Sequence, residues 1–125
     1  MEEYKSLLLS NDLPELYPDS STLLIVYAIY PALTRITCYP IAGKMIWKLS
    51  LTLTSSSPEL LQKITTQLNP SKLIHTTGLS EKGGKFIVEN YISPHQSWLD
   101  SQAIIRSLKE IPNVEACSIQ KISKK

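Results

Sequence analysis

Cysteine is scarce in this chain and forms no cluster. The 125 residues include two cysteines, Cys38 and Cys117, which belong to no Cys-x-x-Cys or Cys/His pattern with zinc-like spacing. We therefore expect reduced structural thiols, with no disulfide framework, no metal centre and no cofactor. The sequence also lacks the basic start and early apolar run of a secretory signal, so we expect no export.

Strong charge of either sign is lacking as well. The formal net charge is +2, with three Lys/Arg against five Asp/Glu in residues 1–45 and ten against six in residues 46–125. The second part is therefore mildly basic, but no run of like charges is dense enough to form a nucleic-acid-binding arm. On this ground a nucleic-acid partner is not the favoured expectation.

Groups that could carry catalysis are few and scattered. His75 is expected in a strand and His95 in a loop, and no serine or cysteine stands in a recognisable nucleophile turn. The acidic residues are equally dispersed, so no carboxylate pair can be argued for acid-base work. We expect a protein that is not an enzyme.

What the chain does contain is enough apolar material for one core. At 125 residues and 42% hydrophobic content, it has the size of a single domain with an appendage. The natural division lies near Pro40–Lys44. We expect an N-terminal segment over residues 1–44, made of helix or loop with an apolar stretch at 22–42, followed by a folded domain over residues 45–123.

The first half of that domain shows a strand followed by a helix. Apolar residues alternate from Trp47 to Leu53, which is typical of a strand with one buried face. In "SSSPELLQKITTQLNP", Ser57 can cap a helix that begins at Pro58 and ends near Pro70. Apolar residues follow at helical spacing: Leu60, Leu61, Ile64 and Leu68.

The second half shows a hairpin, a helix and a last strand. "KLIHTTGLS" and "KFIVENYI" are β-rich runs joined by "EKGG", whose glycines allow a tight turn. "SWLDSQAIIRSLKEI" opens with Ser97 and Asp100 in capping-box-like spacing and places Ile104, Leu108 and Ile111 on one stripe. "VEACSIQKI" offers Val114, Cys117 and Ile119 to the core, and the shift of parity after Val114 predicts a bulge or an irregular strand start.

This element order predicts an α+β fold. Two strand-helix-strand units around a hairpin give the ferredoxin-like β-α-β-β-α-β arrangement, an antiparallel sheet with both helices on one face. RNA-recognition domains share this order, but "GGKFIVENY" matches their third-strand motif poorly. Trp47 is expected in the core, which leaves Tyr91 nearly alone on the exposed face of its strand, and one aromatic makes no stacking platform.

One loop is a candidate ligand site. "TSSSPE" gathers hydroxyls and free N–H groups at a helix start, where an anion or small polar ligand can bind. The candidate ligand-binding residues are Thr54, Ser55, Ser56 and Ser57, although helix capping alone is the favoured explanation of this loop. "EKGGK" feeds a strand, so we interpret it as a hairpin turn and not as a phosphate cradle.

The chain contains the stretch "YPALTRITCYPIAGKMIWKLSLTLTSS", followed by a predicted helix, a hairpin, a second helix and "IPNVEACSI". This order of elements resembles the end of bacterial MgtC/SapB-type inner-membrane proteins. The resemblance spans Tyr30 to Ile122 and rests on pattern. The matching positions are Pro31, Arg35 and Pro40 in a juxtamembrane patch, Trp47 to Leu53 as first strand, and Pro112 to Val114 before the last strand. It implies an ACT-like domain that senses a small ligand or self-associates, and it makes Arg35 and Lys44 candidate membrane-interface residues.

The departure from that family is large, because its many apolar helices and acidic membrane site are missing here. Leu23 to Leu33 gives eleven largely apolar residues, short of the ~20 that a membrane-spanning helix needs. We favour a soluble or membrane-peripheral segment, and its β-branched and aromatic residues also permit a buried strand.

Two functions of different classes follow. The first is a non-catalytic regulatory module that binds a small ligand, a protein partner or a second copy of itself. The alternative is a membrane-attached accessory protein with a peripheral contact at the inner face of a bacterial membrane. RNA binding is a more distant third. The first two place the domain in the cytoplasm.

Overall fold

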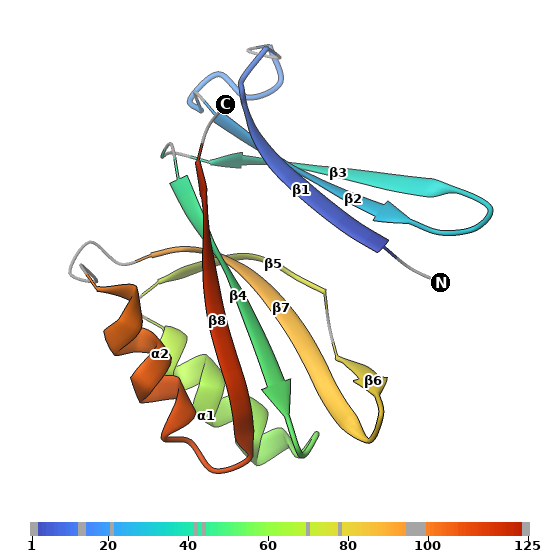
Figure 1. Cartoon of the computed structure of the whole chain (residues 1–125). Coiled ribbons are helices and arrows are strands. Elements are labelled where there is room, and N and C mark those ends of the chain that lie inside the picture. The colour runs from blue at the N-terminus through green and yellow to red at the C-terminus, as the bar shows by residue number, and fades with distance from the viewer. Residues whose placement is uncertain are drawn as a thin grey trace. The chain divides into compact units, whose positions relative to one another are not determined.

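The described residues of the chain form ten strands and helices, and the chain divides into two units. Figure 1 shows its computed structural model, which describes residues 3–12, 15–20, 22–41, 43, 45–69, 71–77, 79–94 and 100–123. The described part has two helices and two antiparallel sheets, so the predicted α+β class is confirmed. One unit comprises Met1–Ile46 with Ile122–Lys125, and the other, the helix-bearing unit, comprises Trp47–Lys121.

The helix-bearing unit contains one strand more than the predicted order, because two short strands stand where one was expected. Its elements are β4 (Met45–Leu53), α1 (Pro58–Leu68), β5 (Lys72–Thr76), β6 (Ser80–Lys82), β7 (Lys85–Ser93), α2 (Ser101–Lys109) and β8 (Val114–Ser123). The strands are arranged in the order β5-β7-β4-β8, and β6 also pairs with β7. Both helices lie on one side of this sheet (Figure 1).

The core of this unit lies between the sheet and the two helices. Leu49, Leu51 and Leu53 of β4 are at most 1% exposed, as the alternating pattern predicts. They pack with Leu60 and Ile64 of α1, Val88 of β7, and Leu108, Ile111 and Val114. Trp47, on the same parity, is also buried.

Both helices begin at residues that cap them. The Ser57 hydroxyl accepts a hydrogen bond from the Leu60 N–H at 3.2 Å, with Pro58 at the first helical position. The Asp100 carboxylate accepts one from the Gln102 N–H at 2.9 Å, so α2 starts at Ser101. Ser97, the other expected capping residue, lies outside the described residues.

The predicted hairpin has the expected turn but an interrupted first strand. Gly83 and Gly84 have φ values of 61° and 78°, the left-handed conformation that a two-residue turn requires. The run "KLIHTTGLS" divides into β5 and β6, because Thr77 leaves the regular ladder. There the Thr77 N–H donates to the Glu89 carbonyl oxygen at 2.9 Å, while its side-chain hydroxyl, and not a carbonyl, accepts from the Glu89 N–H at 3.1 Å.

Strand β8 shows the predicted change of parity. Val114 is buried, and Cys117 and Ile119 pack against the core, while Glu115 and Ala116 are both exposed. Glu115 accepts a hydrogen bond from the Lys85 ammonium at 2.7 Å. The two cysteines of the chain are free thiols.

The burial of Cys117 makes its reactivity predictable. Burial raises the pKa of the thiol to about 11, and the positive charge of Lys109 offsets this only in part. In a Cys38→Ser variant at pH 7.5, we expect iodoacetamide to modify Cys117 more than about a hundredfold more slowly than a free thiol. The rate should rise toward pH 11 and should recover in urea. Equal rates in the folded and unfolded protein would contradict this prediction.

The expectation of a short apolar N-terminal segment is wrong. The structure has a three-stranded antiparallel sheet there, with β1 (Glu3–Ser10), β2 (Thr22–Ile29) and β3 (Thr34–Ile41) in the order β1-β2-β3. The alternative of a buried strand holds for β2. Leu24 and Val26 of this central strand are buried, as is Leu8 of β1.

The prolines that interrupt this region are compatible with a sheet. Pro31 lies in the turn between β2 and β3, which the Tyr30 N–H closes by donating to the Leu33 carbonyl at 2.9 Å. Pro40 lies in β3, an edge strand, where a missing N–H can be tolerated. Apolar side chains also occupy the other face, where Leu9 and Ile36 are 41% and 61% exposed. Across the described ranges, no helix combines the length and apolar character needed to cross a bilayer.

Candidate binding groove

The hydroxyls of the predicted ligand loop take part in local hydrogen bonds. The Thr54 hydroxyl donates to the Asn113 side-chain oxygen at 3.0 Å, and the Ser55 hydroxyl accepts from the Ser57 N–H at 3.1 Å. Ser57 caps α1, and Ser56 is exposed. Three of the four candidates therefore stabilise the loop and the helix start, in keeping with the capping explanation.

Of the two predicted membrane-interface residues, Arg35 is the one that the structure describes. Arg35 is exposed on β3, and its guanidinium carbon lies 5.9 Å from the centroid of the Tyr30 ring, within the range of a cation–π contact. Lys44 lies outside the described residues.

A polar cluster occupies the sheet face opposite the helices. The Lys48 ammonium lies 2.9 Å from the Glu89 carboxylate, and it lies 5.8 Å from the centroid of the Tyr91 ring. Burial lowers the pKa of Lys48, but Glu89 and Tyr91 more than offset this effect, so the pKa is raised above its usual value. His75 stacks at a tilt on Tyr91, with ring centroids 5.8 Å apart, and burial lowers the pKa of this imidazole.

The expectation that Tyr91 is exposed is wrong. Its exposed fraction is 0%, and its cross-strand neighbours are Lys48 on β4 and His75 on β5, which both contact its ring. Tyr91 is thus unable to stack on a nucleic-acid base at the surface.

The described residues contain no group of three or more metal-ligating side chains. His75 contacts Tyr91 as above, and His95 lies outside the described residues.

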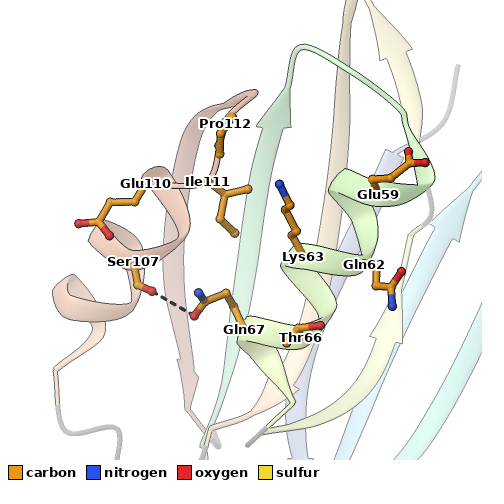
Figure 2. A pocket seen from close by; sticks show the side chains of 9 residues that line it. All are labelled: Glu59, Gln62, Lys63, Thr66, Gln67, Ser107, Glu110, Ile111 and Pro112. Atoms are coloured by element: carbon orange, nitrogen blue, oxygen red, sulfur yellow. Dashed lines mark hydrogen bonds between the residues drawn. The ribbon is translucent and has the colours of Figure 1, made fainter.

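A broad groove separates the outer sides of the two helices. It has a volume of about 630 Å³ and is shown in Figure 2, where Lys63 reaches toward the end formed by Ile111 and Pro112. A hydrogen bond of 3.1 Å from the Ser107 hydroxyl to the Gln67 side-chain oxygen joins the helices across it. Seven of its nine lining residues are polar or charged, including Glu59, Lys63 and Glu110. Such a surface resembles ordinary solvated helix faces more than an enclosed binding site.

A second groove is apolar and runs between α1 and strand β5. It consists of two adjoining hollows of about 360 and 110 Å³, which share Ile64, Thr65, Leu73 and Asn90. We call it the α1–β5 groove, and its other lining residues are Leu61, Leu68, Asn69, Ser71, Thr76, Leu79, Val88 and Ile92. None of these side chains carries a charge. Leu73 and Leu79, which line the larger hollow, are 55% and 39% exposed.

The interruption between β5 and β6 gives this groove its depth. Ile64 and Val88 line the larger hollow and belong to the buried core, at 4% and 8% exposure. The regular pairing of β7 with the edge strands β5 and β6 is interrupted at Thr77. These edge strands therefore do not cover this part of the core continuously. The groove therefore leads from the surface to core side chains.

Asn90 is the polar group of most interest in the α1–β5 groove. In the register of β7 it is opposite Leu49, in the helix-facing row that also contains Val88 and Ile92. It is half-buried and lines both hollows. No described residue makes a hydrogen bond to its side-chain amide. An amide on an apolar face without such a bond is costly unless water or a ligand satisfies it.

Asn90 was not among the residues predicted for a site, although the sequence contains an indication of it. In "KFIVENYI", an amide interrupts the apolar parity of Phe86, Val88 and Ile92. The sequence contains no comparable indication that Leu73 and Leu79 line a groove. Their exposure depends on where the edge strand is interrupted.

No known protein-family model matches this chain, and no curated protein matches its sequence.

Proposed function

We propose that this protein is a non-catalytic binding module whose helix-bearing unit takes an uncharged, largely apolar group into the α1–β5 groove. In this proposal the unit has the ferredoxin-like, ACT-like arrangement. The strand order β5-β7-β4-β8 supports it, since each of its two strand-helix-strand halves contributes one central and one edge strand. A regulatory or accessory role fits a unit of this kind.

The lining of the groove is the observation that carries the proposal. Binding sites for small molecules are typically concave and mostly apolar, with a few polar groups that orient the ligand. The α1–β5 groove combines exposed Leu73 and Leu79, core residues at its floor and a single half-buried amide with no described partner, Asn90. The groove between the helices is larger, but its charged and exposed side chains are already well solvated.

Titration with indole, a neutral apolar probe, tests this proposal. In ¹⁵N-labelled protein we expect saturable shifts of amide signals in α1, β5 and β7, with a dissociation constant in about the millimolar range for a ligand of this size. A Leu73→Glu variant should bind at least about tenfold more weakly, because a carboxylate at the mouth of an uncharged groove resists desolvation.

Leu33→Glu is the matched control. Leu33 is 58% exposed, close to the 55% of Leu73, but it lies in the turn between β2 and β3. Its replacement should leave indole binding unchanged. Shifts that follow the helix–helix groove, or equal loss of binding in both variants, would refute the assignment.

A further inference from the structure

We infer that the ligand of the α1–β5 groove is a neutral small molecule with an apolar body and one amide group, which pairs with the side-chain amide of Asn90. This inference rests on the proposed function and names the ligand class of the same site.

The two hollows of the groove differ in polarity. Five of the eight residues that line the larger hollow are apolar, and Ile64 and Val88 among them belong to the buried core. Four of the eight residues that line the smaller hollow are polar, namely Thr65, Asn69, Ser71 and Asn90. The larger hollow therefore suits an apolar body, and the smaller one, at about 110 Å³, suits a small polar group joined to it.

Two of the hydroxyls in the groove already donate their hydrogen bonds to the protein. The Thr65 hydroxyl donates to the Leu61 carbonyl at 2.9 Å, and the Ser71 hydroxyl donates to the Leu68 carbonyl at 2.7 Å. Toward a ligand, these two hydroxyls can act as acceptors but not as donors. They therefore do not match a ligand group that needs a donor and an acceptor together.

Asn90 is the side chain that offers both functions where the two hollows adjoin. It is half-buried in the helix-facing row of β7 and lines both hollows, whereas Asn69 is exposed to solvent and lines the smaller hollow alone. Water can satisfy the Asn69 amide at the surface. The Asn90 amide makes no hydrogen bond to a described residue, so it gains more from a partner in the ligand.

The natural complement of one amide is another amide. The Asn90 side chain presents a carbonyl acceptor and an NH₂ donor in one plane. A ligand carboxamide presents the same pair and can form two parallel hydrogen bonds with it. An ester offers acceptors alone, so the Asn90 carbonyl would stay without a donor on an apolar face, which costs free energy.

The surroundings of the smaller hollow disfavour an acidic ligand. No charged side chain lines the groove, so a carboxylate would lose hydration without gaining an ionic partner. Leu68 and Asn69, the last residue and the C-cap of α1, line this hollow. Backbone carbonyls carry partial negative charge at this end of a helix, and they repel an anion. A neutral group with N–H donors avoids both penalties.

The test uses the full chain and three probes that share a benzyl group: phenylacetamide, methyl phenylacetate and phenylacetate. The amide offers donors and acceptors, the ester offers acceptors alone, and the acid is ionised at neutral pH. Amide signals of α1, β5 and β7 in ¹⁵N-labelled protein report the binding. We expect phenylacetamide to bind more tightly than the ester and at least about tenfold more tightly than the acid.

Asn90→Leu removes the side-chain amide and nearly keeps the side-chain size. In this variant the affinity ratio of phenylacetamide to methyl phenylacetate should fall at least about fivefold, because the hydrogen bonds to the amide are lost. Asn69→Leu is the matched control, the same substitution at the exposed asparagine of the same groove. There the ratio should stay within about twofold of the wild-type value.

The wild type provides a second readout that needs no variant to fold. Nuclear Overhauser effects should connect the CH₂ protons of phenylacetamide to the side-chain NH₂ of Asn90. Such effects to Asn69 in place of Asn90, or a ratio that falls in Asn69→Leu and not in Asn90→Leu, overturn the inference. Binding of the acid as tight as that of the amide overturns it as well.

Indole separates this failure from failure of the proposed function. If indole binds in the groove while phenylacetamide shows no preference that depends on Asn90, the ligand inference fails and the proposed function stands. If neither indole nor the benzyl probes bind there, both fail.

Discussion

Replacing Leu51 by alanine should lower the free energy of unfolding by about 2–5 kcal/mol. Leu51 lies in central strand β4, is 1% exposed and packs in the core formed with α1 and α2. Its truncation removes buried methyl groups and leaves a cavity, because the helices and the sheet close around it only in part. Urea denaturation followed by circular dichroism measures this loss.

The same substitution at an exposed leucine provides the control. Leu73 is 55% exposed, so Leu73→Ala should cost less than about 1 kcal/mol. If Leu51→Ala costs less than about 0.5 kcal/mol, the assignment of the buried face of β4 is incorrect.

Replacing Gly84 by alanine should destabilise the hairpin between β6 and β7 by about 1–2 kcal/mol. Gly84 has a φ of 78°, in the left-handed region that residues with a Cβ atom occupy at a cost. Apart from Gly84 and its two chain neighbours, no residue has an atom within 4 Å of the position that its Cβ would take, so the penalty comes from backbone conformation and not from a steric clash. Urea denaturation measures this loss as well.

A Gly84→Asn variant separates the two causes. Asparagine is larger than alanine but tolerates the left-handed conformation better. We expect Gly84→Asn to be more stable than Gly84→Ala. The opposite order would indicate a steric penalty that the open surroundings of this turn do not account for.

Where local chemistry decides the conformation, the sequence was informative. Alternation from Trp47 to Leu53 predicted a strand with one buried face, because the two-residue period leaves little choice of face once one parity is apolar. Ser57 and Pro58 marked the start of α1, and the two glycines of "EKGG" marked the turn. Each of these signals acts within a few residues along the chain.

In the N-terminal region, local sequence signals do not predict the structure. In "TLLIVYAI" both parities are apolar, so neither an alternating pattern nor a helical stripe emerges, and Pro40 argues locally against a strand. The register of β2 with β1 and β3 makes it a central strand, and the edge position of β3 makes Pro40 acceptable. Both facts depend on pairing between segments and not on the segment itself.

The sequence by itself thus determined the α+β class and the buried faces of β4, α1 and α2, because caps, turns and periodicity are local properties. Only the tertiary structure decided that Tyr91 is buried between Lys48 and His75, since cross-strand neighbours are set by register. It also decided the α1–β5 groove. That site exists because the edge strand breaks at Thr77, next to a helix that covers the same core, and no single stretch of sequence encodes this juxtaposition.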